Sequence, residues 1–288
     1  MRVAAPDGPN AVALPRPEPA ARSRWWVEIL AIVWLLWVYD AITNLAPLRL
    51  GAALDHARGI LALEQTLGIA PERALDSWLA GHPSIGLALS DYYDNAHFVV
   101  TLGILGWLWW ARADIYRGLR NQLVLINVLA FTVFWRYPVA PPRMLAGFSD
   151  IVASTHAIGS WHSGALASQA NQLAAMPSLH IAWAVWCTIA VFTATRRVWA
   201  RALAVIYPFI TAFAVLATGN HFVLDILGGL LVAVASFAIV HLLSARLRPA
   251  LPAPLRVAHV TNLLRSPRSG RVAEPPQTVE GRFDGSAS

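Results

Sequence analysis

Long apolar segments alternate with polar connections along most of the chain, and their spacing predicts its architecture. Six segments come close to the ~20 residues that a helix needs to cross the hydrocarbon core of a bilayer. They are residues 25–44, 84–110, 119–136, 178–195, 199–218 and 221–244. The pattern therefore predicts an all-α integral membrane protein, built as a bundle of about six transmembrane helices.

A different pattern lies between the first two apolar segments. In residues 47–80, apolar residues such as Leu54 and Ile60 are interleaved with charged residues such as Asp55 and Arg58. This amphipathic alternation is typical of helices that lie on a membrane surface rather than cross it. We therefore expect one or two interfacial helices here.

The remaining segments are rich in polar residues and proline. Residues 1–23 and the segment from 247 onward are rich in Pro and Arg, which predicts a disordered arm and a disordered tail. Residues 137–177 form a long connection between two spans, and loops of this length are usually functional or disordered. The expected organisation is an arm at 1–23, a transmembrane domain at 24–246 that contains this loop, and a tail at 247–288.

Composition supports the membrane assignment and excludes one class of partner. Of 288 residues, 57% are hydrophobic and 13% are charged, about half the usual charged share. All basic residues are arginines, and they flank apolar segments without forming an aromatic-interleaved basic patch. A nucleic-acid partner is therefore not expected despite the net charge of +6. The first apolar segment is too long and begins too late to be a cleaved signal peptide.

The distribution of arginines predicts the orientation in the membrane. Cytoplasmic connections carry the excess of basic residues. On one side of the predicted bundle the connections and span ends hold Arg22, Arg24, Arg112, Arg117, Arg120, Arg196, Arg197, Arg201, Arg246 and Arg248, whereas the other side holds only Arg49, Arg58, Arg73, Arg136 and Arg143. Both termini are therefore predicted to be cytoplasmic, and the loop at 137–177 is predicted to face the outside of the cell membrane.

Two histidines stand where a polar connection meets an apolar segment. Proline is favoured in the first turn of a helix, so Pro177 predicts a helix start with His180 in its first turn. The Gly-Asn turn signal before His221 predicts that this residue also opens a helix. Asp225 then lies one turn further along the same face, where a carboxylate can fix the tautomer of the ring and stabilise its positive charge. This arrangement indicates phosphoryl chemistry.

Further polar residues fall inside the spans on the same side as these histidines. Ionisable groups within a membrane are costly and usually face a bundle interior or a watery cavity. The residues concerned are Asp40, Asn44, Asp91, Asp94 and His97. Their convergence with the histidines indicates a single site near the outer face, whereas Glu28, near the inner end of the first span, does not fit the pattern.

The motifs resemble those of the type-2 phosphatidic acid phosphatase superfamily. The first signature of that superfamily is a basic residue, six residues and then Arg-Pro; here Arg136 and Arg143 have the spacing, with Pro142 before the arginine. The second is Pro-Ser-Gly-His, which here reads Pro177-Ser178-Leu179-His180. These two motifs lie in and directly after the long outer loop.

The third signature is Ser-Arg, five residues, His, three residues and Asp. His221 and Asp225 match it, whereas Val215 occupies the position of the arginine. This replacement and Leu179 favour a closer resemblance to the inositol phosphorylceramide synthase-like branch of the superfamily. The resemblance implies a multi-pass membrane enzyme that acts on a lipid-linked phosphate.

The resemblance also implies a role for each motif residue. His221 is the expected nucleophile, forming a phosphohistidine, with Asp225 orienting its ring. His180 is expected to protonate the leaving alkoxide and then to activate water or an alcohol. Arg143 and Arg136 are expected to neutralise the phosphate oxygens. No metal or cofactor is expected.

Two sets of residues are expected to contact the substrate besides these. Ser178 belongs to the second motif and is expected near the phosphate. Asp91, Asp94 and His97 supply acceptors on the same side of the membrane. They are interpreted either as contacts for a polyol such as inositol or a sugar, or as structural partners of the arginines.

The predicted function is therefore lipid phosphate transfer or hydrolysis at the outer face, with an inositol- or sugar-phosphate transferase favoured. A plain lipid phosphate or pyrophosphate phosphatase is the alternative within this class. A transporter would need polar residues throughout the depth of the membrane, whereas here they concentrate on one side. A non-catalytic scaffold with the same fold is the remaining alternative.

Overall fold

The computed structural model describes residues 24–45, 49–155 and 173–247. The predicted N-terminal arm, nearly all of the predicted C-terminal tail and part of the long connection at 137–177 lie outside these residues. The chain divides into two units, Met1–Leu243 and Ser244–Ser288, and the helix bundle described below belongs to the first. The described residues contain helices and no strand, apart from an isolated bridge between Val139 and Ala174.

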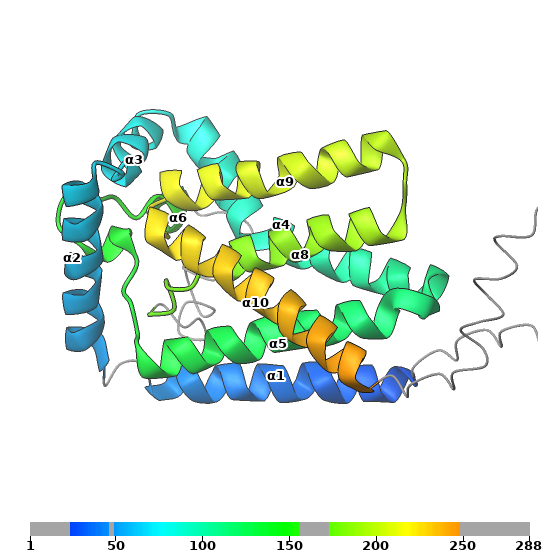
Figure 1. Ribbon diagram of the computed structural model, residues 1–288. Helices are drawn as coiled ribbons and strands as arrows, with labels where there is room; N and C mark the ends of the chain where they lie inside the picture. Colours follow the sequence, from blue (N-terminus) through cyan, green and yellow to red (C-terminus); the bar gives the residue numbers. More distant parts are fainter. Residues whose placement is uncertain (1–23, 46–48, 156–172, 248–288) are drawn as a thin grey trace, which may run out of the picture. The chain divides into compact units, whose positions relative to one another are not determined.

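Each of the six apolar segments is one long helix (Figure 1). These helices are α1 (Trp25–Leu45), α4 (Pro83–Ala111), α5 (Ala113–Arg136), α8 (Leu179–Ala194), α9 (Val198–Ala217) and α10 (Val223–Leu247). Helix α8 lies at the centre of the bundle and packs against α4, α5 and α9. The prediction of a helical membrane bundle is confirmed.

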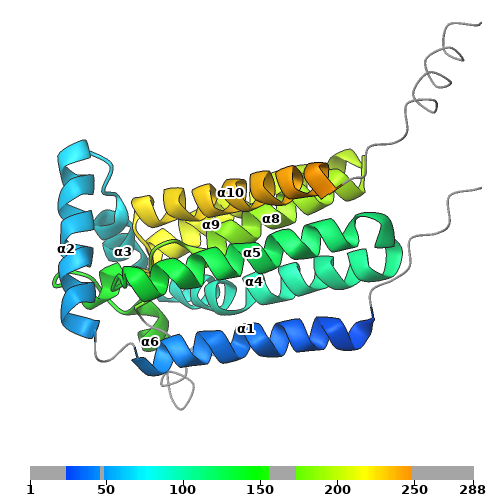
Figure 2. The same ribbon diagram turned by 60° about the horizontal axis from the view of Figure 1, so that its bottom comes forward.

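The amphipathic segment forms two helices, α2 (Leu50–Leu67) and α3 (Glu72–Ala80). Helix α2 lies across one end of the bundle, as Figures 1 and 2 both show. It buries a stripe that includes Ala53, Ala57 and Ile60, and exposes the opposite side that carries Asp55 and Arg58. The long connection at 137–177 adds a short helical turn, η2 (Pro142–Met144), and a short helix, α6 (Ile151–Thr155), at this same end.

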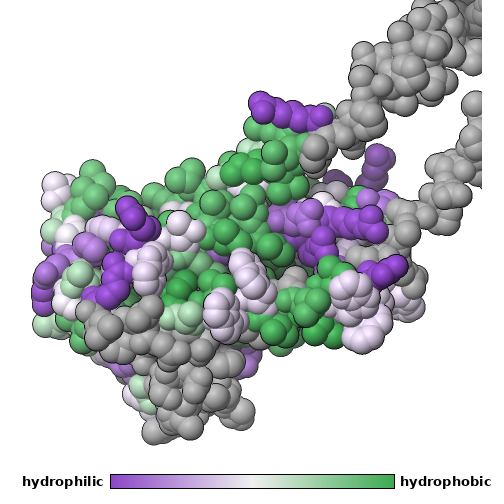
Figure 3. All heavy atoms as spheres, turned by 90° about the horizontal axis from the view of Figure 1, so that it is seen from below, coloured by the Kyte–Doolittle hydropathy of each residue, from purple (hydrophilic) through white to green (hydrophobic). Residues whose placement is uncertain are grey.

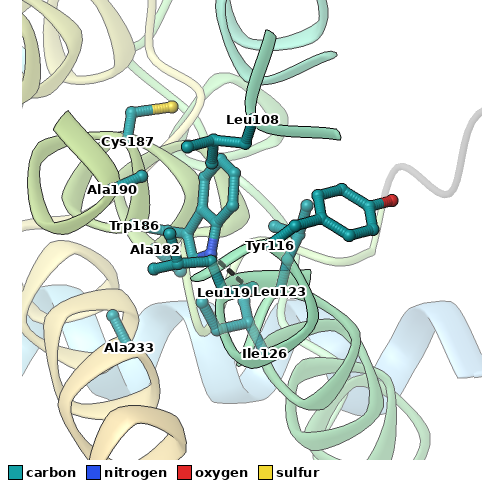
Figure 4. Close-up of a cluster of buried hydrophobic side chains, with 10 residues drawn as sticks. All are labelled: Leu108, Tyr116, Leu119, Leu123, Ile126, Ala182, Trp186, Cys187, Ala190 and Ala233. Atoms are coloured by element: carbon teal, nitrogen blue, oxygen red, sulfur yellow. Dashed lines mark hydrogen bonds between the residues drawn. The ribbon is translucent and has the colours of Figure 1, made fainter. Parts of the chain in front are cut away.

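The largest hydrophobic cluster joins α4, α5, α8 and α10 around Trp186 (Figure 4). The indole ring is 1% exposed, and its Nε1–H donates to the carbonyl oxygen of Leu119 at 2.9 Å. Burying the polar edge of an indole is favourable only when it finds such an acceptor. Ala233 brings α10 against this cluster, where it is 2% exposed. The four helices are therefore held together well away from the end that carries α2.

Three helices of the described chain are long and apolar enough to cross a membrane by length and composition: α5, α9 and α10. Two of the other predicted spans carry the polar groups singled out above: α4 contains Asp91, Asp94 and His97, and α8, with His180, is 16 residues long. The face in Figure 3 carries an apolar band between two hydrophilic ends. The exposed side chains of α9 and α10, such as Phe209 and Leu231, are typical of a lipid-facing surface.

The structure also explains Glu28, which the sequence pattern left without a role. Its carboxylate accepts a hydrogen bond from Arg120 of α5 at 2.7 Å, and both side chains are largely buried. This ion pair ties α1 to α5, the helix against which it packs.

Candidate functional site

His221 lies in the turn that precedes α10. The helix begins at Val223, so the prediction that His221 opens the helix is wrong by two residues. The reason is local, because the N–H groups of Asn220 and His221 both donate to the carbonyl of Val215 and thus belong to the turn that ends α9. The side chain of His221 is nevertheless fixed, with 4% of the residue exposed.

Two acceptors face one ring nitrogen of His221. Nδ1 lies 2.8 Å from the carbonyl oxygen of Ala175 and 3.4 Å from Oδ2 of Asp225. A carbonyl oxygen can only accept, so Nδ1 carries a proton and Nε2 is left with its lone pair. Oδ2 of Asp225 also accepts the N–H of Phe222 at 2.8 Å, which fixes the carboxylate beside the ring. The arrangement leaves Nε2 as the nitrogen able to react.

His180 faces that reactive nitrogen. Its Nδ1 lies 3.3 Å from Nε2 of His221, and Nδ1–H is the donor because Nε2 holds the lone pair. The ring of His180 stacks on Tyr93 and contacts His97 edge-on, with ring centroids 4.4 and 4.3 Å away. The two rings thus bring a proton donor and a lone pair to one place at the start of α8 and α10.

Helix α8 begins at Leu179, with Ser178 as its N-cap. The prediction that Pro177 lies in the first turn is therefore wrong, because Pro177 precedes the cap and follows a cis peptide bond. His180 does lie in the first turn. Ser178 is fully buried; its hydroxyl accepts the N–H of Ile181 at 3.5 Å, so in this structure it serves as a helix cap.

Helices α8 and α10 approach each other closely at the site. The N–H of Ser178 donates to the carbonyl of Asp225 at 2.9 Å. A Cβ atom added at Gly229 would lie 2.3 Å from the carbonyl oxygen of Ser178, so only glycine permits this contact. The start of α8, which bears His180, is therefore held directly against the first turns of α10, next to His221.

Arg143 lies beside the turn that carries His221. Its guanidinium donates to Oδ1 of Asn220, its Nε lies 3.4 Å from Oδ2 of Asp150, and its backbone N–H donates to Gly219 at 2.8 Å. Gly219 adopts a left-handed conformation with φ of 64°, which closes the turn before His221. Arg143 is 9% exposed, so its charge is held in place next to the histidine.

The other residues that were predicted to contact the substrate lie at different distances from His180 and His221. His97 of α4 reaches the ring of His180, and its own Nδ1 lies 3.0 Å from the carbonyl of Tyr93. Asp94, one turn before it, is 1% exposed, and Asp91 is half-buried. Arg136 is exposed at the end of α5 and is not brought into contact with the histidines. Asp40 and Asn44 lie on the last turns of α1.

The described part of the chain contains no group of three or more His, Cys, Asp or Glu side chains that could hold a metal ion. The groups gathered at the site are two histidines, an arginine and carboxylates in fixed hydrogen bonds. Such a set can attack phosphorus, move a proton and neutralise an anion.

The family model of the PAP2 superfamily, the superfamily that the motifs resemble, matches residues 58–239. The match covers more than half of the chain and includes both arginines and both histidines of the motifs. The chain belongs to the PAP2 superfamily. No curated protein and no solved structure is significantly similar to it. Membership of the PAP2 superfamily indicates a phosphatase or phosphotransferase of lipid-type substrates.

The chain departs from the PAP2 signature at Val215, and the structure shows what replaces the arginine there. Val215 is fully buried and packs against Tyr93 and Val152, so this position faces a hydrophobic cluster. Its backbone carbonyl receives the two hydrogen bonds that form the turn before His221. In this member of the PAP2 superfamily the position shapes the turn and supplies no cation.

Four residues at the PAP2 site were missed by the sequence reasoning. Asn220 was interpreted only as a turn residue, and Asp150 was not singled out. Glu64 and Glu72 lie in the segment that was predicted to form surface helices, yet both are fully buried. The burial of Glu64 could have been predicted from helical spacing, because Glu64 lies on the same helix face as Ala53, Ala57 and Ile60.

Proposed function

We propose that this member of the PAP2 superfamily transfers or hydrolyses a lipid-linked phosphate at the outer membrane face through a phosphohistidine at His221. The observation that carries the proposal is the state of the His221 ring. Its Nδ1–H is directed to Ala175 and Asp225, and its Nε2 is directed to His180. A buried imidazole with a fixed tautomer keeps its lone pair on Nε2 for nucleophilic attack, and His180 lies beside it to supply a proton to the leaving oxygen.

The proposed reaction has two balanced steps. In the first, Nε2 of His221 bonds to phosphorus, the bond from phosphorus to the leaving oxygen breaks, and His180, in its doubly protonated imidazolium form, gives that oxygen a proton and becomes neutral. Asp225 and the Ala175 carbonyl stabilise the positive charge that develops on the ring. In the second, His180 takes a proton from water or an alcohol, whose oxygen bonds to phosphorus as the bond to Nε2 breaks.

The structure supports Arg143 as the main cation for the phosphate. It lies beside the turn that carries His221, held by Asn220 and Asp150. Stabilising charge on the phosphoryl oxygens is the largest task in such a transfer, and a pre-positioned guanidinium performs it without reorganisation. Arg136, which is exposed at the end of α5, is proposed to act as a more distant contact.

A polyol-bearing substrate or acceptor is proposed because of the polar groups on α4. His97 contacts His180, and Asp94 lies one turn away from His97 within the buried part of the bundle. Carboxylates repel phosphate but accept hydrogen bonds from hydroxyl groups. This placement supports a transferase of the inositol- or sugar-phosphate type. Hydrolysis of a plain lipid phosphate is the alternative.

The decisive experiment is a substrate screen on the protein purified in detergent, using lipid phosphates, lipid pyrophosphates and phosphoinositol lipids. We expect His221→Ala to lose at least about 10³-fold in turnover, together with acid-labile phosphate bound to the protein. The matched control is His241→Ala, an exposed histidine near the far end of the same helix. Near-normal turnover by His221→Ala contradicts the proposed mechanism, and no turnover of any phosphate by the wild type favours a scaffold.

A further inference from the structure

Three carboxylates from three helices cap the start of α10. Oδ2 of Asp225 accepts the N–H of Phe222 at 2.8 Å, and Oε1 of Glu72 on α3 accepts the N–H of Val223 at 2.9 Å. Oε1 of Glu64 on α2 accepts the N–H of Leu224 at 2.6 Å. All three carboxylates belong to fully buried residues. Three consecutive N–H groups of the first turn are therefore occupied by charged or polar acceptors.

This capping determines what the start of α10 can do. The first N–H groups of a helix have no partner within the helix and attract anions. Here they are taken by carboxyl groups, so this helix start does not bind the substrate phosphate. The capped residues follow His221 directly and precede Asp225. The position of the histidine and its carboxylate thus depends on two side chains from the surface helices α2 and α3.

The two glutamates also contact each other. Their second oxygens, Oε2, are both buried and have no hydrogen-bond partner in the described part of the chain. The two carboxyls hold neighbouring N–H groups and lie close enough for the charge of Glu72 to raise the pKa of Glu64. Two ionised carboxylates have only acceptors, so neither of these buried oxygens can satisfy the other unless one carboxyl carries a proton. A single shared proton satisfies both oxygens and removes the repulsion between them.

The surroundings of the pair strengthen its hold on that proton. Asp225 and His221 lie on the α10 side, and Asp76 and Arg143 lie further away beside Gly219. His56, on the same helix as Glu64, faces Pro138 and Tyr137 instead. Burial, followed by the negative charge of Glu72, raises the pKa of Glu64 to about 8 although the N–H of Leu224 opposes this shift.

We propose that Glu64 and Glu72 are positioning residues for His221 and Asp225, and that they act as a pair that shares one proton. The pair never touches the substrate. With the proton present, both carboxyls hold the first turn of α10. When the proton is lost, two buried negative charges meet beside Asp225, and α2 and α3 separate from α10. The expected effect of the pair on turnover rests on the proposed function, whereas its expected effect on the stability of the fold does not.

The pH dependence of stability follows with a defined sign. The folded protein keeps the proton on Glu64 up to about pH 8, whereas the unfolded chain releases it near the ordinary value of 4.5. Between these values the folded state binds more protons, so stability falls as pH rises. Glu64→Gln removes this slope, because its amide accepts from Leu224 and donates to Glu72 without titrating.

The test compares Glu64→Gln and Glu64→Leu with Asp55→Asn, a control on the exposed side of the same helix. Turnover is measured with short-chain phosphatidate in detergent. We expect Glu64→Gln to stay within about threefold of the wild type near pH 6 and to exceed it at about pH 9. Glu64→Leu should lose at least about 30-fold in kcat with a much smaller change in KM, because it misplaces the nucleophile. Asp55→Asn should match the wild type.

Thermal unfolding, followed by tryptophan fluorescence from pH 5 to about pH 9, gives a second readout that needs no activity. We expect the Tm of the wild type to fall with pH more steeply than that of Glu64→Gln. Equal slopes, or turnover by Glu64→Leu equal to that of Asp55→Asn, overturn the proposal. A third outcome separates the two proposals. If the wild type cleaves no phosphate, but its Tm still falls with pH more steeply than that of Glu64→Gln, the proposed function is overturned and the shared proton is supported.

Discussion

The hydrogen bond from His221 to the Ala175 carbonyl determines which ring nitrogen can react. An imidazole that could exchange tautomers would present Nε2 as a nucleophile only part of the time. Here a backbone carbonyl, which cannot donate, is 2.8 Å from Nδ1. A carboxylate partner alone would leave the ring freer to turn, so the carbonyl and Asp225 act together in directing Nε2 toward His180.

His180→Ala should separate proton transfer from nucleophilic attack. Turnover of an alkyl phosphate should fall by about 10²–10⁴-fold, because the alkoxide leaves without a proton. Turnover of 4-nitrophenyl phosphate should fall much less in the first step, because its leaving group needs no proton. Steady-state rates and phosphoenzyme levels with the two substrates measure the difference. An equal loss in phosphoenzyme formation on both substrates argues against a proton-donor role.

Replacing Arg143 should lower kcat/KM far more than replacing Arg136. Arg143→Ala should lower kcat/KM by about 10²–10³-fold, because it removes a buried cation next to His221. Arg136→Ala should cost much less, since that side chain is exposed at the end of α5. Arg58→Ala, an exposed arginine on α2, is the control. Equal losses for Arg143→Ala and Arg136→Ala in phosphatase assays contradict this ranking.

Asp91→Asn and Asp94→Asn test the nature of the head group. If these carboxylates accept hydrogen bonds from a polyol, both variants should impair turnover of phosphoinositol lipids by at least about tenfold more than turnover of phosphatidate. The ratio of kcat/KM for the two substrates is the measurement. Equal losses on both substrates assign the two residues to the structure of the bundle and favour a plain lipid phosphatase.

At the scale of the helices, the close contact between α8 and α10 at Gly229 leaves no space for a larger side chain. Gly229→Ala should destabilise the protein by about 1–3 kcal/mol, because the new methyl group overlaps the carbonyl of Ser178 and no flexible side chain can yield there. Gly103→Ala on α4 is the control, since no atom lies within 4 Å of its Cβ position. Thermal unfolding in detergent compares the two. A Tm for Gly229→Ala equal to that of Gly103→Ala shows that the helices can separate without cost.

Sequence reasoning located the long helices well, because an apolar run of about 20 residues has few other structures available. It failed at helix starts, where one or two hydrogen bonds decide the boundary. Pro177 precedes the cap of α8, and His221 belongs to the turn that Val215 closes. Periodicity alone could have placed Glu64 on the buried stripe of α2, but the partner that makes its burial tolerable comes from α10, 160 residues away.

The candidate site was assembled from motifs that lie far apart in sequence, and the structure brings three of their residues together. His180, His221 and Asp225 meet because α8 and α10 touch at Gly229. The role of Ser178 as a cap could not be inferred from its motif, because a serine beside a phosphate site serves equally well in either role. Arg136 and Arg143 share a motif but differ in burial, since one ends a helix and the other enters η2.

In the whole molecule, the arginine-rich connections and the candidate site lie at opposite ends of the bundle (Figure 1). Arg112 joins the α4–α5 connection to the end of α8 through the carbonyl of Ala194. Arg201 donates to the carbonyl of Thr195 in the same region. The predicted orientation therefore places this end in the cytoplasm and the histidines outside.

Cysteine labelling on intact cells tests that orientation. In a Cys187→Ser background, Ser154→Cys at an exposed position of α6 and Ser168→Cys in the loop predicted to face outside should react with an impermeant thiol reagent. Ser266→Cys in the C-terminal segment should react only after lysis. The opposite result would reverse the topology and move the candidate site to the cytoplasmic side.

The ion pair between Glu28 and Arg120 has a consequence for how the protein is made. The two residues are 92 positions apart, so at about 5–20 residues per second the ribosome needs about 5–20 s to deliver the arginine after the glutamate. Glu28 lies in the first turn of α1, at a helix end, where its carboxylate can remain hydrated among lipid head groups during this interval. The first helix can thus form this ion pair only after the start of the fifth has been synthesised, so it must wait at the membrane surface until then.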